Sequence, residues 1–319
     1  MQGGEWKGRR RPTRFRRFRR GRLALIAVFA ALFIFGLVKL IGYGADYVSA
    51  QRTAETLRQL SRPEASAAPA ETAAPSAVPS AAPSPALPKA APGPTAAPAV
   101  RLENADYPFN STLKISDRFR ILRGKNKEIV GWLTIGNLLD EAVVQRDEMY
   151  YMTHDALGAP NVNGAIFLDS GVSLKTRPYT FVLYGHNLKT GAMFGSLRNY
   201  EKVSFYHSNP FITFDTLYET GRYVIFAAGS VSTEKYGRHY VDFFALTGMN
   251  IPDRQTAIDA LKAASVHTCM VDVQPEDQLL LLVTCVEKDE DRRVVAARRI
   301  RDGEDEKKLK ELVERSRKR

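Results

Sequence analysis

The most reactive side chain in this sequence is the thiol of Cys285. It ends the apolar run from Leu279 to Thr284, and the charged turn VEKDEDR follows directly. A cysteine at the end of a buried strand lies at the rim of a fold, where a substrate can reach it and neighbouring cations can lower the pKa of a thiol. Because the thiolate is the nucleophilic form of cysteine, this placement indicates nucleophilic catalysis.

Two adjacent arginines begin the next predicted strand, RRVVAARRI. This strand should return antiparallel beside the Cys285 strand through a tight connection, which would place Arg293 across from Cys285. A guanidinium has a fixed positive charge and planar donors, which suit a thiolate or the oxyanion that forms when a thiolate attacks a carbonyl. Arg292 is the alternative residue for this role.

A proton carrier for such chemistry would be one of five histidines. His186 follows the predicted strand YTFVLYG, so it too lies at a strand end, and Gly185 before it allows the backbone to turn. His267 is two residues from Cys269, but no second pair of ligands completes a four-coordinate site, so no metal is expected. The remaining histidines lie in polar, loop-like contexts typical of the surface: His154, His207 and His239.

The N-terminal part of the chain predicts a membrane anchor. Residues 1–22 hold ten Lys or Arg against one Glu, a local charge of +9 out of +11 for the whole chain. The apolar residues 23–43 that follow would span roughly 31 Å as a helix, close to the thickness of a bilayer. The positive-inside rule puts the tail in the cytoplasm and the rest outside, so nucleic-acid binding is not expected. A cleaved signal peptide is the rival interpretation, although the apolar run is longer than usual for one.

The segments on either side of the main domain have biased compositions. Residues 44–62 predict a short juxtamembrane helix, with apolar residues at helical spacing. Residues 63–102 are rich in Pro, Ala, Ser and Thr, which predicts an extended spacer that holds a domain away from the membrane. Residues 303–319 are interpreted as a charged C-terminal tail.

Residues 103–302 predict one mainly β domain with helices. Short apolar or alternating runs recur between turn residues, which is typical of an antiparallel barrel or sandwich. A helical pattern opens the domain before the strand at residues 129–135, and a second helix is predicted at 253–265, directly before the Cys285 strand. The other predicted strands are EAVVQ, GAIFLD, YTFVLYG, FITFD, RYVIFAAGS, QLLLLVTC and RVVAARRI.

Several of these segments resemble the signature regions of class B sortases. They are LLVTCVEKDEDRRVVAARR, YGHNLKTGAMFGSL and, nearer the N-terminus, IVGWLTI, AVVQRDEMYYM and NGAIFLDS. The similarity covers residues 120–300 in the same order. It implies a closed β-barrel of about eight strands, with an N-terminal helix and a helix inserted before the strand of the catalytic cysteine.

The resemblance also implies an activity and a set of site residues. Cys285 would be the nucleophile, His186 the family histidine and Arg293 the catalytic arginine, with Tyr184 and Thr284 as substrate contacts. The enzyme would cleave a C-terminal sorting motif of exported proteins through a thioester and pass the acyl group to an amine of peptidoglycan or of a pilin. It would need no cofactor or metal. Val283 and Glu148 depart from the family pattern, which leaves the sorting motif open.

Two further interpretations compete with this one. An anchored cysteine peptidase would only hydrolyse its substrate. A surface scaffold or binding module would instead use Cys269 and Cys285 in a disulfide, since exported proteins often form such bridges.

Overall fold

The computed structural model describes residues 15–62, 102, 105–147, 150–285 and 291–319, and the side chains of residues 15–27 and Cys285 are outside this description. The predicted basic tail therefore lies largely outside the described residues, as do Glu148 and almost all of the predicted spacer.

Helix α1 (Phe15–Ser61) is continuous, where the sequence predicted a membrane span and a separate juxtamembrane helix. No proline interrupts it, and Gly42 and Gly44 are tolerated inside it. Its apolar part is long enough to cross a membrane, and its large apolar side chains are exposed, as Phe33 is at 72%. Within the described ranges it is the one such helix, which fits a single-pass membrane anchor.

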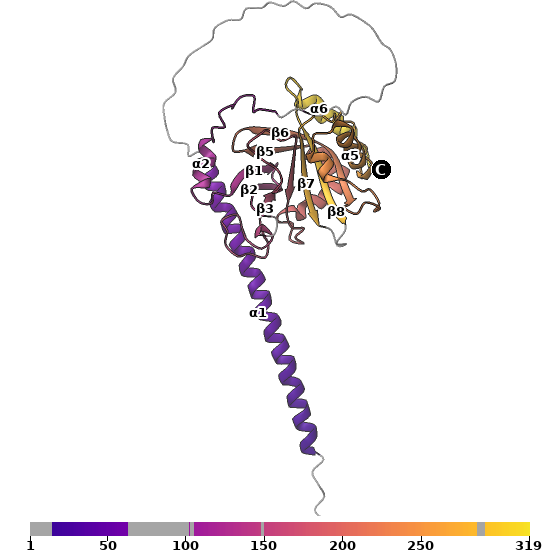
Figure 1. The fold of residues 1–319 in the computed structure, drawn as a ribbon. Coiled ribbons are helices and arrows are strands. Elements are labelled where there is room, and N and C mark those ends of the chain that lie inside the picture. The colour runs from indigo at the N-terminus through magenta and orange to yellow at the C-terminus, as the bar shows by residue number, and fades with distance from the viewer. Residues whose placement is uncertain (1–14, 63–101, 103–104, 148–149, 286–290) are drawn as a thin grey trace, which may run out of the picture. The chain divides into compact units, whose positions relative to one another are not determined.

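Residues Ala50–Arg319 form one compact unit, and the chain up to Ser49 forms another. The last turns of α1 therefore belong to the folded domain and not to the anchor. Within this unit eight strands close into a barrel in the order β1-β2-β3-β4-β7-β8-β6-β5 (Figure 1). The strands are β1 (Ile129–Ile135), β2 (Leu139–Val144), β3 (Ile166–Leu168), β4 (Thr180–Tyr184), β5 (Phe211–Thr216), β6 (Thr220–Ser232), β7 (Leu279–Cys285) and β8 (Asp291–Arg299).

The barrel confirms the predicted fold class and excludes the sandwich. Each predicted strand is present, but the expectation of a wholly antiparallel sheet was wrong. The pairs β2–β3 and β4–β7 are parallel, and the other six neighbouring pairs are antiparallel. Parallel neighbours need crossover connections, which is why long segments separate β2 from β3 and β4 from β7.

The barrel interior is filled by side chains from strands on opposite sides. The rings of Phe181 on β4 and Phe214 on β5 meet edge to face with centroids 5.1 Å apart, although their strands are not neighbours. Strand β7 is fully buried from Leu279 to Leu282, as expected for a strand covered on both faces. In the sequence such a covered strand is a continuous apolar run, which is the pattern that precedes Cys285.

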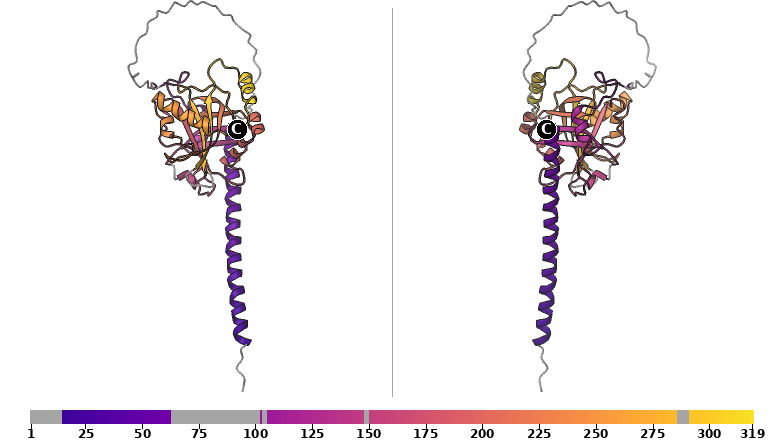
Figure 2. Two further views of the ribbon diagram at one scale, coloured as in Figure 1. Left: turned by 90° about the vertical axis from the view of Figure 1, so that its right-hand side faces the viewer. Right: turned by 90° about the vertical axis from the view of Figure 1, so that its left-hand side faces the viewer.

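The helices of the catalytic unit lie outside the barrel (Figure 2). Helix α5 (Ile251–Ala264) confirms the helix predicted at 253–265 to within two residues. Helix α6 (Glu306–Glu314) was missed, because residues 303–319 were interpreted as a charged tail; Leu309 and Val313, one turn apart, are buried and Asp305 caps its start. The remaining helical segments are α2 (Asp117–Arg123), η1 (Tyr150–Met152), η2 (Phe194–Glu201), α3 (Val203–Ser208) and α4 (Phe243–Thr247).

Candidate active site

The ends of β4 and β7 meet at one rim of the barrel. These strands run parallel, with Tyr184 paired to Val283 at the end of the ladder. His186 lies two residues beyond Tyr184, and Cys285 lies two residues beyond Val283. Because parallel strands end at the same edge, the topology brings the predicted histidine and the predicted nucleophile to neighbouring positions at that edge.

His186 is held by the backbone of two other segments. Its Nε2 lies 2.7 Å from the carbonyl oxygen of Met152, and its own carbonyl accepts a hydrogen bond of 3.1 Å from the N–H of Phe194. A carbonyl oxygen can only accept, so Nε2 carries the proton of this bond. In the neutral ring, Nδ1 is then the nitrogen that is able to take up a proton.

Gly164 allows this close approach. It has a φ of +62°, and a Cβ at this position would lie 2.6 Å from the carbonyl oxygen of Tyr151 and 2.9 Å from Cδ2 of His186. Both the backbone angle and the lack of space therefore require glycine. This residue belongs to the predicted segment NGAIFLDS, where its role beside the histidine was not foreseen.

The β7–β8 ladder decides which arginine lies opposite Cys285. These antiparallel strands pair Cys285 with Arg292 and Thr284 with Arg293. Directly paired residues in an antiparallel sheet occupy the same face, and neighbouring residues occupy opposite faces. Arg292, and not Arg293, is therefore on the sheet face of position 285.

The interior contact of Phe181 identifies the two faces. Phe181 points into the barrel and pairs with Leu280, so Leu280 lies on the inner face of the barrel wall. Side chains alternate along a strand, so Thr284, four residues after Leu280 on β7, also lies on the inner face, together with its partner Arg293. Tyr184, three residues after Phe181 on β4, lies on the outer face of the barrel wall. The register places position 285 and Arg292 on this outer face as well.

Arg293 forms an ion pair with Glu201. Its Nη2 lies 2.7 Å from Oε1 of Glu201, the last residue of η2, and the arginine side chain is 16% exposed. Helix η2 packs against β6, β7 and β8. The ion pair of Arg293 therefore connects η2 to the end of the barrel.

A groove of about 410 Å³ borders this rim on the outward side. Its wall includes Tyr184, whose hydroxyl donates to Oδ2 of Asp169 over 3.1 Å. The other lining residues come from the β3–β4 turn and from the segment around α4: Gly171, Thr233, Tyr240, Val241, Asp242, Phe243, Phe244 and Thr247. Thr284 does not line this groove. Its side chain is buried, and its Oγ1 has no hydrogen-bond partner among the described residues.

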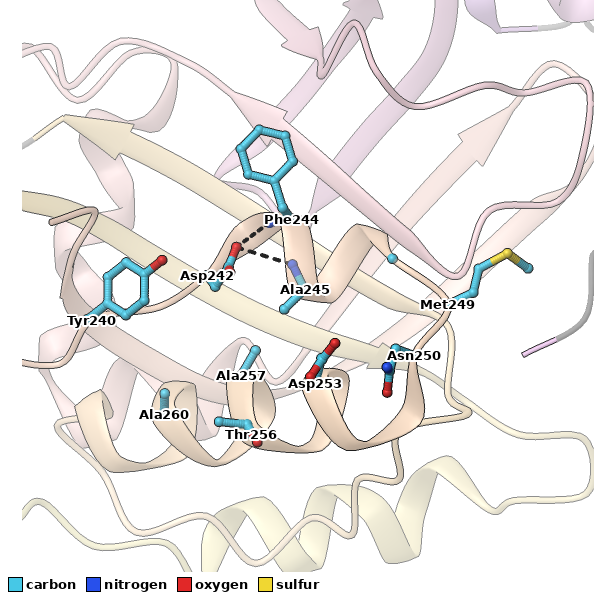
Figure 3. A pocket seen from close by; sticks show the side chains of 11 residues that line it. Tyr240, Asp242, Phe244, Ala245, Met249, Asn250, Asp253, Thr256, Ala257 and Ala260 are labelled. Carbon is cyan, nitrogen blue, oxygen red and sulfur yellow. Dashed lines mark hydrogen bonds between the residues drawn. The ribbon is translucent and has the colours of Figure 1, made fainter. Parts of the chain in front are cut away.

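A second cavity of about 710 Å³ lies between α4 and α5 (Figure 3). It shares Tyr240, Asp242 and Phe244 with the groove, so α4 forms a wall common to both. Asp242 caps α4 by accepting hydrogen bonds from the N–H groups of Phe244 and Ala245, as Figure 3 shows. This cap fixes the start of the shared wall.

Arg254 connects α4, the wall shared by the groove and the second cavity, to the barrel. It is fully buried on α5, and burial lowers the pKa of its guanidinium to about 10. Its Nη1 donates to Oγ1 of Thr180 over 2.9 Å and to the carbonyl of Leu246 on α4, while Nε donates to the carbonyl of Pro275. One side chain therefore ties α4 and α5 to β4 and to the segment that precedes β7.

Two other reactive residues that the sequence singled out, Cys269 and His267, show no sign of activation. Cys269 is a free, half-buried thiol, and burial raises its pKa, which is the opposite of activation. His267 is buried, with Nε2 bound to the carbonyl of Tyr200. Within the ranges that the structure describes, no group of three or more His, Cys, Asp or Glu side chains is arranged to hold a metal ion.

Comparisons with known proteins agree with this fold. The sortase domain family matches residues 135–300. Sortase B of Listeria monocytogenes is 30% identical over 179 residues, which cover 55% of this chain and 70% of the relative. Sortase B of Staphylococcus aureus is 32% identical over 174 residues, covering 54% and 68%.

Solved structures give the same result. A substrate complex of Staphylococcus aureus sortase B aligns with a TM-score of 0.53 at 30% identity, covering 60% of this chain and 88% of that one. A Bacillus anthracis protein described as similar to sortase B aligns with a TM-score of 0.53 at 26% identity, covering 63% and 88%.

This chain belongs to the sortase family. Its relatives by sequence and by structure are sortases B, so it is a class B sortase, a cysteine transpeptidase that acts on sorting motifs.

Proposed function

We propose that the protein works outside the cell, held by its N-terminal helix, and joins exported proteins to an amine of the cell wall. The basic tail before the apolar helix supports this orientation through the positive-inside rule. The observation that carries the proposed site is the convergence of the β4 and β7 ends, with His186 and Cys285 at neighbouring positions beside a groove.

In this mechanism the Cys285 thiolate attacks the carbonyl carbon of the threonine in the sorting motif. The C–N bond after that threonine breaks, the leaving amine takes a proton from His186, and a thioester remains. An incoming amine then attacks the thioester and loses a proton to His186. A new amide bond forms as the thiolate departs, which returns the enzyme to its first state.

The arginine of this mechanism would stabilise the oxyanion on the attacked carbonyl. The resemblance to class B sortases predicted Arg293 for this role, with Arg292 as the alternative. The strand register favours Arg292, because it lies on the face of position 285, while Arg293 lies on the opposite face. We therefore assign the role to Arg292 in this proposal.

Tyr184 is the better supported of the two expected substrate contacts, because it lines the groove. The buried Thr284 is better explained as part of the barrel end. A peptide bound in the groove would lie between Tyr184 and α4, with the scissile carbonyl near the rim.

The acceptor is proposed to be a peptidoglycan amine. A solved sortase B that is 29% identical to this chain, with a TM-score of 0.53, was complexed with triglycine, a short peptide with a free amine. A pilin lysine is the alternative acceptor, and hydrolysis alone is the alternative outcome.

The acceptor is tested by product analysis. The full-length protein in detergent micelles would be incubated with a sorting-motif peptide and either a glycine or diaminopimelate peptide or a lysine-bearing pilin peptide. The proposal predicts a conjugate with the cell-wall type amines, detected by mass spectrometry. A conjugate formed only with the pilin lysine would support polymerisation, and free acid as the sole product under all conditions would show a hydrolase.

A further inference from the structure

The end of the anchor helix is packed against the catalytic barrel. In the last turns of α1, Leu57 is 1% exposed and Ala54 is buried. Arg58 donates from Nη2 to Oε1 of Glu141 over 2.7 Å and from Nε to the carbonyl of Asp140 over 2.8 Å, both on β2. Apolar burial and directed hydrogen bonds together fix this segment on the domain.

One contact of this helix leads toward the active site. Oγ1 of Thr53 donates to Oδ2 of Asp155 over 2.8 Å. Asp155 is buried, at 3% exposed, and its other oxygen accepts hydrogen bonds of 3.0 Å from the N–H groups of Leu157 and Ala159. The Asp155 carboxylate therefore joins α1 to the turn that follows η1.

The same segment presents the carbonyl that holds His186. Met152 lies three residues before Asp155, and its carbonyl oxygen is 2.7 Å from Nε2 of His186. The backbone here is pinned further by hydrogen bonds from Asn161 N–H to the Thr153 carbonyl and from Ala165 N–H to the Tyr151 carbonyl. A continuous run of contacts thus links Thr53 on α1 to the imidazole.

We propose that the last turns of α1 are a positioning element for catalysis: Thr53, through Asp155 and the segment 150–164, holds the Met152 carbonyl against Nε2 of His186. This inference rests on the proposed role of His186 as the proton carrier. The carbonyl fixes the tautomer of the ring, so that Nδ1 is the nitrogen that exchanges protons with the substrate.

The Pro/Ala-rich segment connects two points of the same folded unit. The chain is already part of the catalytic unit at residues 50–61, and it is bound to the unit again at Leu102, whose N–H donates to the carbonyl of Met249 over 2.7 Å. The catalytic unit therefore begins before the Pro/Ala-rich segment in the chain.

The test compares two threonines on the same helix. Thr53→Val removes the bond to Asp155, whereas Thr56→Val is the matched control, because Thr56 is exposed and bonds only to the carbonyl of Arg52 in its own helix. Both variants are made in the full-length protein and assayed with a fluorogenic sorting-motif peptide. We expect Thr53→Val to lower kcat about tenfold with KM within about twofold, and Thr56→Val to behave as the wild type.

Two further measurements separate positioning from a general loss of stability. Nitrogen chemical shifts of the His186 ring, recorded at a pH where the ring is neutral, report its tautomer, and Thr53→Val should produce a mixture where the wild type has Nε2–H alone. Asp155→Asn should reproduce the effect. Unchanged kcat and an unchanged tautomer in a folded Thr53→Val variant would overturn the inference and leave the proposed function standing. Full activity of His186→Ala would instead overturn the proposed function itself.

Discussion

Arg292 lies directly across the β7–β8 ladder from Cys285, and Arg293 lies across from Thr284. These two arginines are neighbours in sequence but occupy opposite faces of the barrel wall. Loss of a guanidinium that stabilises an oxyanion costs on the order of 10² to 10³ in rate. We expect this loss in kcat/KM for Arg292→Ala with the sorting-motif peptide.

Arg293→Ala is the matched variant for this comparison. It removes the ion pair with Glu201, whose side chain is 55% exposed, so the expected cost is about 1 kcal/mol of stability or less and only a small change in rate. The assignment to Arg292 is wrong if Arg293→Ala shows the large loss of kcat/KM and Arg292→Ala does not.

Gly164→Ala should damage catalysis through His186. A Cβ at this position would clash with the carbonyl of Tyr151 and press on the imidazole. Gly303→Ala is the control, because Gly303 also has a positive φ, +82°, but has open space around the added Cβ. Both substitutions carry a backbone cost of about 1 kcal/mol, seen as a lower Tm. Only Gly164→Ala should also lose kcat, and equal kcat for the two variants would argue against the contact with His186.

Arg254→Met should loosen the wall between the groove and the second cavity. It leaves the buried carbonyls of Pro275 and Asp277 without this donor, which costs about 3 kcal/mol or more in the free energy of unfolding. Where the variant remains folded, KM for the peptide should rise more than kcat falls.

The control for this variant is Gln255→Met on the same helix, because the Gln255 amide bonds only to Asp259 one turn away. Denaturant unfolding and peptide kinetics check both variants. A KM for folded Arg254→Met that equals the value for Gln255→Met would show that the position of α4 does not depend on the hydrogen bonds of Arg254.

Local patterns in the sequence were sufficient for the eight strands and for helix α5. Each of the eight strands was visible as a short run of β-branched, aromatic or leucine residues, and α5 was visible from its helical spacing. The parallel pairing of β4 with β7 was not visible, because pairing depends on contacts between distant segments. It is this pairing that brings His186 to the rim that holds Cys285.

The site depended on a register that the sequence could not supply. Shifting a strand by one residue exchanges its faces, so only the ladder itself shows which of Arg292 and Arg293 is paired with Cys285. The Met152 carbonyl was equally hidden, because a backbone oxygen 34 positions from His186 carries no residue type to recognise. Helix α6 was missed because charged residues surround its two buried side chains, Leu309 and Val313.

The central claim is that acyl transfer passes through a thioester on Cys285. Its most direct test is intact-protein mass spectrometry of the full-length protein mixed with a sorting-motif peptide in the absence of an added amine. We expect an adduct with the mass of the acyl half of the peptide, localised to Cys285, lost on addition of triglycine and absent from Cys285→Ala. Product formation by Cys285→Ala, or an adduct on Cys269 in its place, would contradict the claim.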